Sequence, residues 1–292
     1  MRKITKAVIP AAGLGTRVLP ATKSIPKEML PLVDKPAIHY LVEEAVQAGI
    51  TDILIVTNRG KSALEDYFDR APELEERLLA SGKQALYEQI TALSRIANIQ
   101  YVRQKETKGL GHAVLCARAF AAGEPVAVLY GDDVIVSPPG VSATGELCAA
   151  WERYGLGVAG IRKVPESFIS KYSSLKVAPL ADHLFHISDM IEKPAPEEAF
   201  SLYSVVGRCI LPPAVFDILE DTPPGAGGEI QLTDAMARLA RGPGMIGVEY
   251  SGTHYDMGNK LCLLKATVEL GLAHEELGAE FRAWLREYAK AL

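Results

Sequence analysis

The chain has 292 residues, of which 48% are hydrophobic and 23% are charged, a composition typical of a globular protein with a sizeable core. The formal net charge of -5 argues against nucleic acid as a partner, because nucleic-acid-binding domains carry basic patches. No apolar stretch approaches the roughly 20 residues of a membrane span and no signal-peptide pattern is present, so we expect a cytoplasmic protein without a membrane partner. The cysteines are scattered without metal-ligand spacing, which predicts reduced thiols.

The N-terminal segment combines a predicted buried strand at residues 7–9 with a loop rich in glycine and basic residues. Gly13 and Gly15 allow the backbone to approach a bulky anion and to point N–H groups at it. Arg17 and Lys27 lie just beyond and can neutralise a polyphosphate. Prolines in this segment exclude a continuous helix and predict a stiff, extended path for the loop: Pro20, Pro26, Pro31 and Pro36.

Predicted strands and helices alternate through the first half of the chain. This alternation predicts an α/β fold with a Rossmann-like mixed, mostly parallel central sheet and helices on both faces. Ligands of such sheets bind beyond the carboxyl ends of the strands, so loops 11–17, 104–111 and 131–134 are expected to share one cleft. The expected elements are a helix at 37–48, a strand at 52–57, two or three helices between 61 and 96, a strand at 99–103, a helix at 111–120 and a strand at 125–130.

The second half of the chain is less regular. It has no linker, repeat or low-complexity segment, so we expect a single domain over residues 1–292. Trp284 and other apolar residues near the C-terminus exceed what one buried helix face needs, which suggests burial against another subunit. The expected elements are strands at 157–162, 184–192, 205–211 and 245–249, a Pro/Gly-rich loop at 223–228, a helix at 229–241 and a helical stretch from about Asn259.

The glycine loop matches neither of the two commonest phosphate-binding motifs. A dinucleotide fingerprint needs a third glycine, where this chain has Val18, and a following helix, which Pro20 interrupts. The Gly-Lys-Ser/Thr of a Walker loop is missing as well. The segment from Gly13 to Pro36, GLGTRVLPATKSIPKEMLPLVDKP, instead resembles the nucleotide-sugar pyrophosphorylases, and among them the bacterial UTP–glucose-1-phosphate uridylyltransferases. The resemblance extends over nearly the whole chain.

Two aspartates follow predicted strands. Asp132 comes after the apolar run at residues 127–130, and Asp256 lies in the segment HYDMGN that begins at His254. Taken alone, Asp132 fits a turn and Asp256 fits a helix cap, while carboxylates at such positions also suit a divalent cation. The resemblance implies that Asp132 and Asp256 hold Mg²⁺ together.

The resemblance also implies which residues face the two substrates. Glu192 is expected on the sugar hydroxyls and Lys193 on the sugar phosphate, beside Tyr172 and Ser173. The family usually has glycine at the position of Ser173 and often asparagine near Leu202, so the chain departs from the family in its sugar half. The amide of Gln104 offers a donor and an acceptor that suit uracil. The residues matched to nucleotide contacts are Ala11, Ala12, Gly13, Gly15, Glu28, Gln104 and Gly109.

The activity that the resemblance implies is an in-line displacement in which glucose 1-phosphate attacks the α-phosphorus of UTP, giving UDP-glucose and pyrophosphate. Arg17 is then expected on the leaving pyrophosphate, Lys27 near the α-phosphate and Lys193 on the attacking phosphate. Two alternatives stay open from the sequence: the same chemistry with another nucleotide or sugar, as in a thymidylyltransferase, and a catalytically silent regulatory paralogue.

The resemblance also divides the expected domain by role. Residues 1–140 form the nucleotide-binding half and residues 141–258 the sugar-phosphate half. Residues 259–292 form a helical region for oligomerisation. Because members of the family are commonly dimers or tetramers, we expect a homodimer or a homotetramer.

Overall fold

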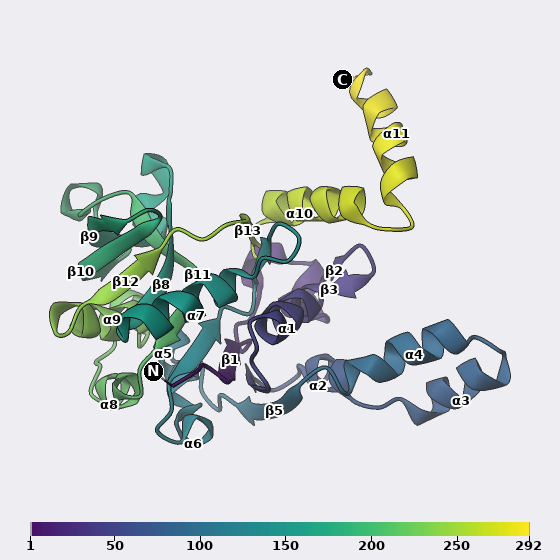
Figure 1. The fold of residues 1–292 in the computed structure, drawn as a ribbon, viewed down its shortest axis with the longest axis horizontal. Coiled ribbons are helices and arrows are strands. Elements are labelled where there is room, and N and C mark those ends of the chain that lie inside the picture. The colour runs from purple at the N-terminus through teal and green to yellow at the C-terminus, as the bar shows by residue number, and fades with distance from the viewer. Residues whose placement is uncertain (1, 292) are drawn as a thin grey trace.

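A computed structural model describes residues 2–291 and contains a nine-stranded sheet with helices on both faces (Figure 1). The strand order is β5-β4-β1-β6-β11-β8-β12-β10-β9. Only β10 and β11 run against the other strands of this sheet, so the predicted mixed, mostly parallel sheet is confirmed. The strands are β1 (Lys6–Pro10), β4 (Asp52–Thr57), β5 (Asn98–Arg103), β6 (Val126–Leu129), β8 (Gly157–Lys163), β9 (Ser173–Ala181), β10 (Leu184–Glu192), β11 (Tyr203–Leu211) and β12 (Met245–Val248).

The sheet separates two apolar cores. Val8 and Ile9 are neighbours on β1 but belong to different cores, because successive side chains of a strand point to opposite faces. The core around Ile9 is closed by α1 and α7, and the core around Val8 by α5, α8 and α9. The helices are α1 (Ala37–Gln47), α2 (Ser62–Phe68), α3 (Pro72–Ala80), α4 (Gln84–Leu93), α5 (Leu110–Leu115), α6 (Arg118–Ala121), α7 (Ala143–Tyr154), α8 (Ala214–Glu220), α9 (Leu232–Arg241), α10 (Lys260–Ala273) and α11 (Gly278–Ala289).

Two helix predictions need correction, and α7 and α8 were not predicted. The expected helix at 111–120 is two helices, because the N–H of Ala117 bonds to Val114 three residues back and the chain turns there. The expected helix at 229–241 begins only at Leu232. The helix cannot begin earlier because the backbone of Ile230 is bonded elsewhere. Its N–H donates to the carbonyl of Lys108, and its carbonyl accepts from the N–H of Gly111.

The loop after β1 is not extended, and that prediction was wrong. Its prolines separate three short 3₁₀ turns, because the φ angle of proline suits a single helical turn as well as an extended path. The prolines do exclude a continuous helix, as expected. The turns are η1 (Thr16–Val18), η2 (Ala21–Lys23) and η3 (Lys27–Met29), and a small ribbon of β2 (Pro31–Leu32) and β3 (Lys35–Pro36) leads into α1.

A second two-stranded ribbon joins distant parts of the chain. It consists of β7 (Asp133–Val136) and β13 (Thr253–Asp256), which pair antiparallel with Asp133 opposite Asp256. Neither strand was predicted. The pairing of Asp133 with Asp256 brings the two aspartate-bearing segments together.

The remaining 3₁₀ turns are η4 (Glu166–Lys171), η5 (Pro196–Glu198) and η6 (Ala226–Gly228).

Helices also extend away from the sheet. The hairpin of α3 and α4 projects at one side, and α10 and α11 project at another (Figure 1). Within α10 only Ala266 and Gly271 are buried, whereas Leu261 and Leu264 are 59% and 64% exposed. No helix within residues 2–291 has the length and apolar character that crossing a membrane requires.

Candidate active site

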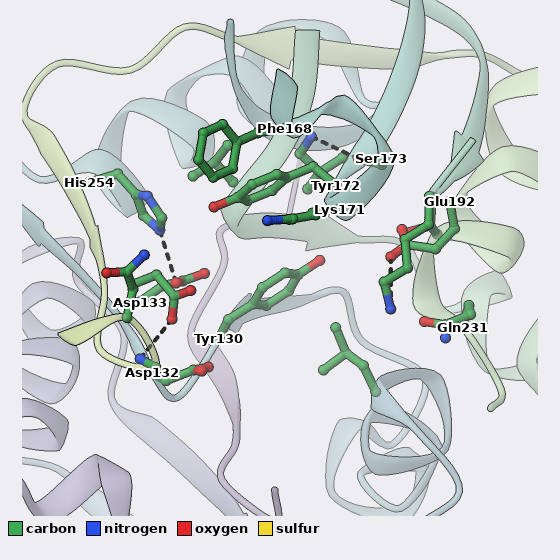
Figure 2. A pocket seen from close by; sticks show the side chains of 18 of the residues that line it. Tyr130, Asp132, Asp133, Phe168, Lys171, Tyr172, Ser173, Glu192, Gln231 and His254 are labelled. Atoms are coloured by element: carbon green, nitrogen blue, oxygen red, sulfur yellow. Dashed lines mark hydrogen bonds and ion pairs between the residues drawn. The ribbon is translucent and has the colours of Figure 1, made fainter. Parts of the chain in front are cut away.

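An open cavity of about 730 Å³ lies between the β6–β7 loop, η4, the ends of β9 and β10, α9 and β13. Figure 2 shows Tyr130 and Tyr172 between Asp132 on one side and Glu192 on the other. The three loops expected to share a cleft all contribute to the lining, through Arg17, Leu110 and Asp132. The expected site residues that line the cavity are Arg17, Asp132, Tyr172, Ser173, Glu192, Lys193 and Asp256.

The other expected residues lie on the loops that follow β1 and β5, outside the lining of this cavity. They are Ala11, Ala12, Gly13, Gly15, Lys27, Glu28, Gln104 and Gly109. Lys27 is joined to the cavity through its Nζ, which lies 2.5 Å from Asp132 Oδ2. The same Nζ would lie 3.5 Å from a Cβ added at Gly13, so the glycine loop folds closely around this amino group.

Three aspartates meet at the ribbon end. Arg17 bonds Asp256 through Nη1 at 2.6 Å and lies 3.4 Å from Asp132 through Nη2. His254 Nε2 lies 2.9 Å from Asp133 Oδ1 (Figure 2). Burial raises the pKa of Asp132, but Lys27 and Arg17 outweigh it and hold that pKa below its usual value. Burial raises the pKa of Asp133 in spite of His254. Asp132 is therefore the more acidic member of this adjacent pair.

A buried ion pair between Lys61 and Glu28 contacts the glycine loop. Lys61 Nζ lies 3.0 and 2.9 Å from the two carboxylate oxygens of Glu28 and also donates to the carbonyl of Ala11 at 2.5 Å. Asn58 donates to the carbonyl of Ala12. Glu28 is fully buried, so its expected contact with a nucleotide stays a prediction. Asn58 and Lys61 were not predicted as site residues, although both follow β4, as Gln104 follows β5.

The predicted base-binding residues contact one another. Gln104 Nε2 donates to the carbonyl of Gly109 at 3.1 Å and lies 2.9 Å from His112 Nδ1. Gly109 has a φ of 96°, and a Cβ there would lie 2.6 Å from the Cβ of Glu229. Only glycine combines this left-handed conformation with so close an approach. The path of the loop at this position therefore requires glycine.

The part of the site that was expected to bind the sugar is built around Glu192. Thr233 Oγ1 donates to Glu192 Oε2 at 2.7 Å, and burial raises the pKa of Glu192 despite this bond and Lys193. Lys193 has a φ of 47°, a left-handed conformation that is strained for a residue other than glycine. Ser173 is buried, and its Oγ lies 3.0 Å from that of Ser204. Ser173 stands where the family usually has glycine, and its hydroxyl has a hydrogen-bond partner within the sheet.

Several cavity residues were missed by the sequence analysis. Aromatic and polar side chains of η4, of α9 and of the residue that precedes α9 line the cavity without any local motif: Phe168, Lys171, Gln231 and Thr233. Gln231 and Thr233 fall within the helix that the sequence predicts at 229–241, where nothing marks them as site residues. The contribution of Thr233 depends on its hydrogen bond to Glu192 of β10, which lies far away in the sequence.

The carboxylates of Asp132 and Asp256 suit a magnesium ion whose other ligands are water and substrate phosphates. Within residues 2–291, no three His, Cys, Asp or Glu side chains group as a metal site. Asp132 and Asp256 nevertheless bond one guanidinium, so oxygens of both face the same point. Mg²⁺ usually takes one or two carboxylates and adds water and substrate phosphates. The pair has the right chemistry for this role.

Known proteins resemble the chain over nearly its whole length. The UTP–glucose-1-phosphate uridylyltransferase YngB of Bacillus subtilis is 47% identical, covering 99% of this chain and 97% of that protein. The UDP-glucose pyrophosphorylase structure from Acinetobacter baumannii has a TM-score of 0.91 at 40% identity, covering 98% of this chain and 99% of that one. A UDP-glucose pyrophosphorylase complexed with UDP-glucose has a TM-score of 0.84 at 40% identity, covering 93% and 100%.

The chain also matches the model of a protein family. The model of the nucleotidyl transferase family matches residues 6–271, a span that contains every residue of the site described above. The chain belongs to the nucleotidyl transferase family.

Proposed function

We propose that this chain transfers the uridylyl group of UTP to glucose 1-phosphate, giving UDP-glucose and pyrophosphate. The observation that carries the proposal is one cavity with two cation-bearing sides. Arg17 and the Asp132–Asp256 pair line one side, and Glu192 with Lys193 lines the other. Such a cavity suits two phosphate-bearing substrates. The names of the Bacillus relative and of the UDP-glucose complex support uridine and glucose as the two groups.

The proposed reaction is a single in-line displacement. An oxygen of the sugar phosphate forms a bond to the α-phosphorus of UTP. The bond from the α-phosphorus to the oxygen that bridges to the β-phosphate breaks, and pyrophosphate leaves with that electron pair. Because the attacking phosphate is already anionic, no strong base is needed, and positioning with charge neutralisation carries catalysis.

Each cation has a proposed substrate group. Lys27 neutralises the α-phosphate region, Arg17 contacts the leaving pyrophosphate and Lys193 holds the attacking phosphate. Asp132 and Asp256 would hold Mg²⁺, which when bound supplies further positive charge to the phosphate oxygens.

The remaining site residues orient the two substrates. Glu192 accepts hydrogen bonds from sugar hydroxyls beside Tyr172 and Ser173. Gln104 and Gly109 bind the uracil edge. The loop of Ala11, Ala12, Gly13 and Gly15, with Glu28 beneath it, holds the ribose and the phosphates. These roles are supported by the cavity lining, by the Gln104–Gly109 bond and by the burial of Glu28 below the loop.

The purified chain is expected to release pyrophosphate when supplied with UTP, glucose 1-phosphate and Mg²⁺. The test compares UTP with dTTP, ATP and GTP, and glucose 1-phosphate with other sugar 1-phosphates, while chromatography identifies the nucleotide sugar. A preference for dTTP would contradict the uridylyl assignment. Lack of turnover with every pair would contradict the enzyme assignment.

Removal of divalent metal is expected to abolish turnover, because two carboxylates and two polyanionic substrates otherwise repel one another in a partly buried site. Activity is measured after treatment with EDTA and gel filtration, and again after Mg²⁺, Ca²⁺ or Mn²⁺ is added back. Full activity of the metal-free enzyme would contradict the assignment of Asp132 and Asp256.

Replacement of Thr233 by valine is expected to raise the KM for glucose 1-phosphate about tenfold, because Glu192 loses a hydrogen bond to a charged group. The KM for UTP is expected to stay within twofold, and Thr233→Ser is expected to restore the wild-type value. Thr91→Val is the matched control, since Thr91 is a buried threonine on α4 whose hydroxyl bonds only carbonyls of its own helix. An unchanged KM in Thr233→Val would contradict the role of Glu192.

We propose that the enzyme is a cytoplasmic homodimer or homotetramer, with residues 1–140 and 141–258 as nucleotide and sugar-phosphate halves of one domain. Residues 259–292 are the proposed oligomerisation region. The support is the apolar surface of α10 and α11, where Trp284 and Tyr288 stack at 5.2 Å and are 54% and 51% exposed. Sedimentation of the intact chain and of a Trp284→Glu variant tests this assembly.

A further inference from the structure

Arg17 bonds both aspartates that the proposed function assigns to Mg²⁺. Its Nη1 lies 2.6 Å from Asp256 Oδ2, and its Nη2 lies 3.1 Å from Asp256 Oδ1 and 3.4 Å from Asp132 Oδ2. The guanidinium is also packed against Gly258, where an added Cβ would collide with it. Asp256 is therefore held in a two-pronged contact that uses both of its carboxylate oxygens.

We propose that Arg17 is a tethered cation that closes the Asp132–Asp256 pair to divalent metal until a polyphosphate draws the guanidinium away. This inference rests on the proposed magnesium site. A metal ion and the guanidinium compete for the same carboxylate oxygens. They also repel each other, because both are cations that would sit against the same carboxylate oxygens.

The two cations next to Asp132 differ in how freely they can move. The side chain of Arg17 is 60% exposed, whereas that of Lys27 is 15% exposed. Arg17 can therefore leave its position by rotating into solvent, while Lys27 is held by the loop around it. Arginine binds phosphate in the same two-pronged geometry that it uses with carboxylate. The triphosphate thus offers Arg17 a replacement partner and frees both aspartates together.

The test measures metal affinity of the intact enzyme without nucleotide. Mn²⁺ binding is followed by electron paramagnetic resonance, and Mg²⁺ binding by calorimetry. Arg17→Gln is expected to bind metal at least about tenfold more tightly than the wild type, because a competing unit charge is removed. Arg17→Lys is expected to stay within about threefold of the wild type, since it keeps the charge. Arg153→Gln, at an exposed position on α7, is the control and is expected to change nothing.

The double variant Arg17→Gln, Asp256→Asn locates the gained site and is expected to lose the gain. Catalytic turnover of Arg17→Gln is expected to fall while its metal affinity rises, a combination that a general structural defect does not produce. Unchanged or weaker metal binding by Arg17→Gln would overturn the inference and leave the proposed reaction standing. Failure of the wild type to make UDP-glucose would instead refute the proposed function.

Discussion

Replacement of Lys27 by methionine is expected to lower kcat for UDP-glucose formation by about 10²- to 10³-fold. Lys27 is the proposed contact for the α-phosphate, whose phosphorus is attacked during the displacement. Burial lowers the pKa of Lys27, but Asp132 and Glu28 outweigh burial and raise it, so the amino group is charged at neutral pH. Methionine keeps the length of the side chain and removes this charge from a site with little water.

The matched control for this change is Lys23→Met. Lys23 lies in the same loop, in η2, but is exposed, so its replacement is expected to leave kcat within twofold. Both variants are assayed at saturating UTP, glucose 1-phosphate and Mg²⁺, and their unfolding temperatures are compared with that of the wild type. A folded Lys27→Met enzyme that retains more than one third of the wild-type kcat would remove Lys27 from the mechanism.

The parallel half of the fold was predictable because its strands are buried on both faces. Strands β1, β4 and β6 are short apolar runs between helices, and a chain of such units forms a parallel sheet. The ribbon of β7 and β13 was not predictable in the same way. Each strand has four residues, and their pairing depends on a contact between segments far apart in the sequence.

Some residues of the site could likewise be predicted from the sequence, and others could not. Asp132 follows the buried strand β6 and Gln104 follows the edge strand β5, and both were identified from these positions together with the family resemblance. Lys61 and Thr233 sit at the starts of ordinary helices, and nothing local distinguishes them from solvated residues or caps. Glu28 and Glu192 were expected from the resemblance, but their hydrogen bonds with Lys61 and Thr233 become visible only in the tertiary structure.

The path of the glycine loop was predicted wrongly from its prolines. The prolines were interpreted as fixing an extended path, but each is compatible with a single 3₁₀ turn. The turns place Lys27 against Gly13 and bring Arg17 over the ribbon end, where it meets Asp256. An extended loop has no comparable means of holding Lys27 and Arg17 at one point.

Replacement of Glu44 by leucine is expected to destabilise the fold by about 3 to 5 kcal/mol, because it leaves the buried charge of Arg208 without a partner. Arg208 is 1% exposed, and its Nε and Nη2 lie 3.0 and 2.6 Å from the two oxygens of Glu44. The same carboxylate also accepts hydrogen bonds from the backbone and side chain of Thr144 on α7. One glutamate thus joins α1, α7 and β11.

The effect is expected to reach the active site. Arg208 Nη1 and the N–H of Tyr130 both donate to the carbonyl of Gly207, and Gly207 packs against Asp133. Loss of Glu44 should therefore loosen the loop that carries Asp132, and kcat should fall even under conditions where the variant stays folded.

Urea unfolding at pH 7 measures the stability change. Glu152→Leu, at an exposed position on α7, is the control and is expected to stay within about 0.5 kcal/mol of the wild type. The double variant Glu44→Leu, Arg208→Met removes both charges and is expected to regain at least half of the loss, since a buried ion pair can often be replaced by apolar groups. If the double variant is less stable than Glu44→Leu alone, the bonds of Arg208 to β11 outweigh the cost of its unpaired charge, and the ion-pair explanation is wrong.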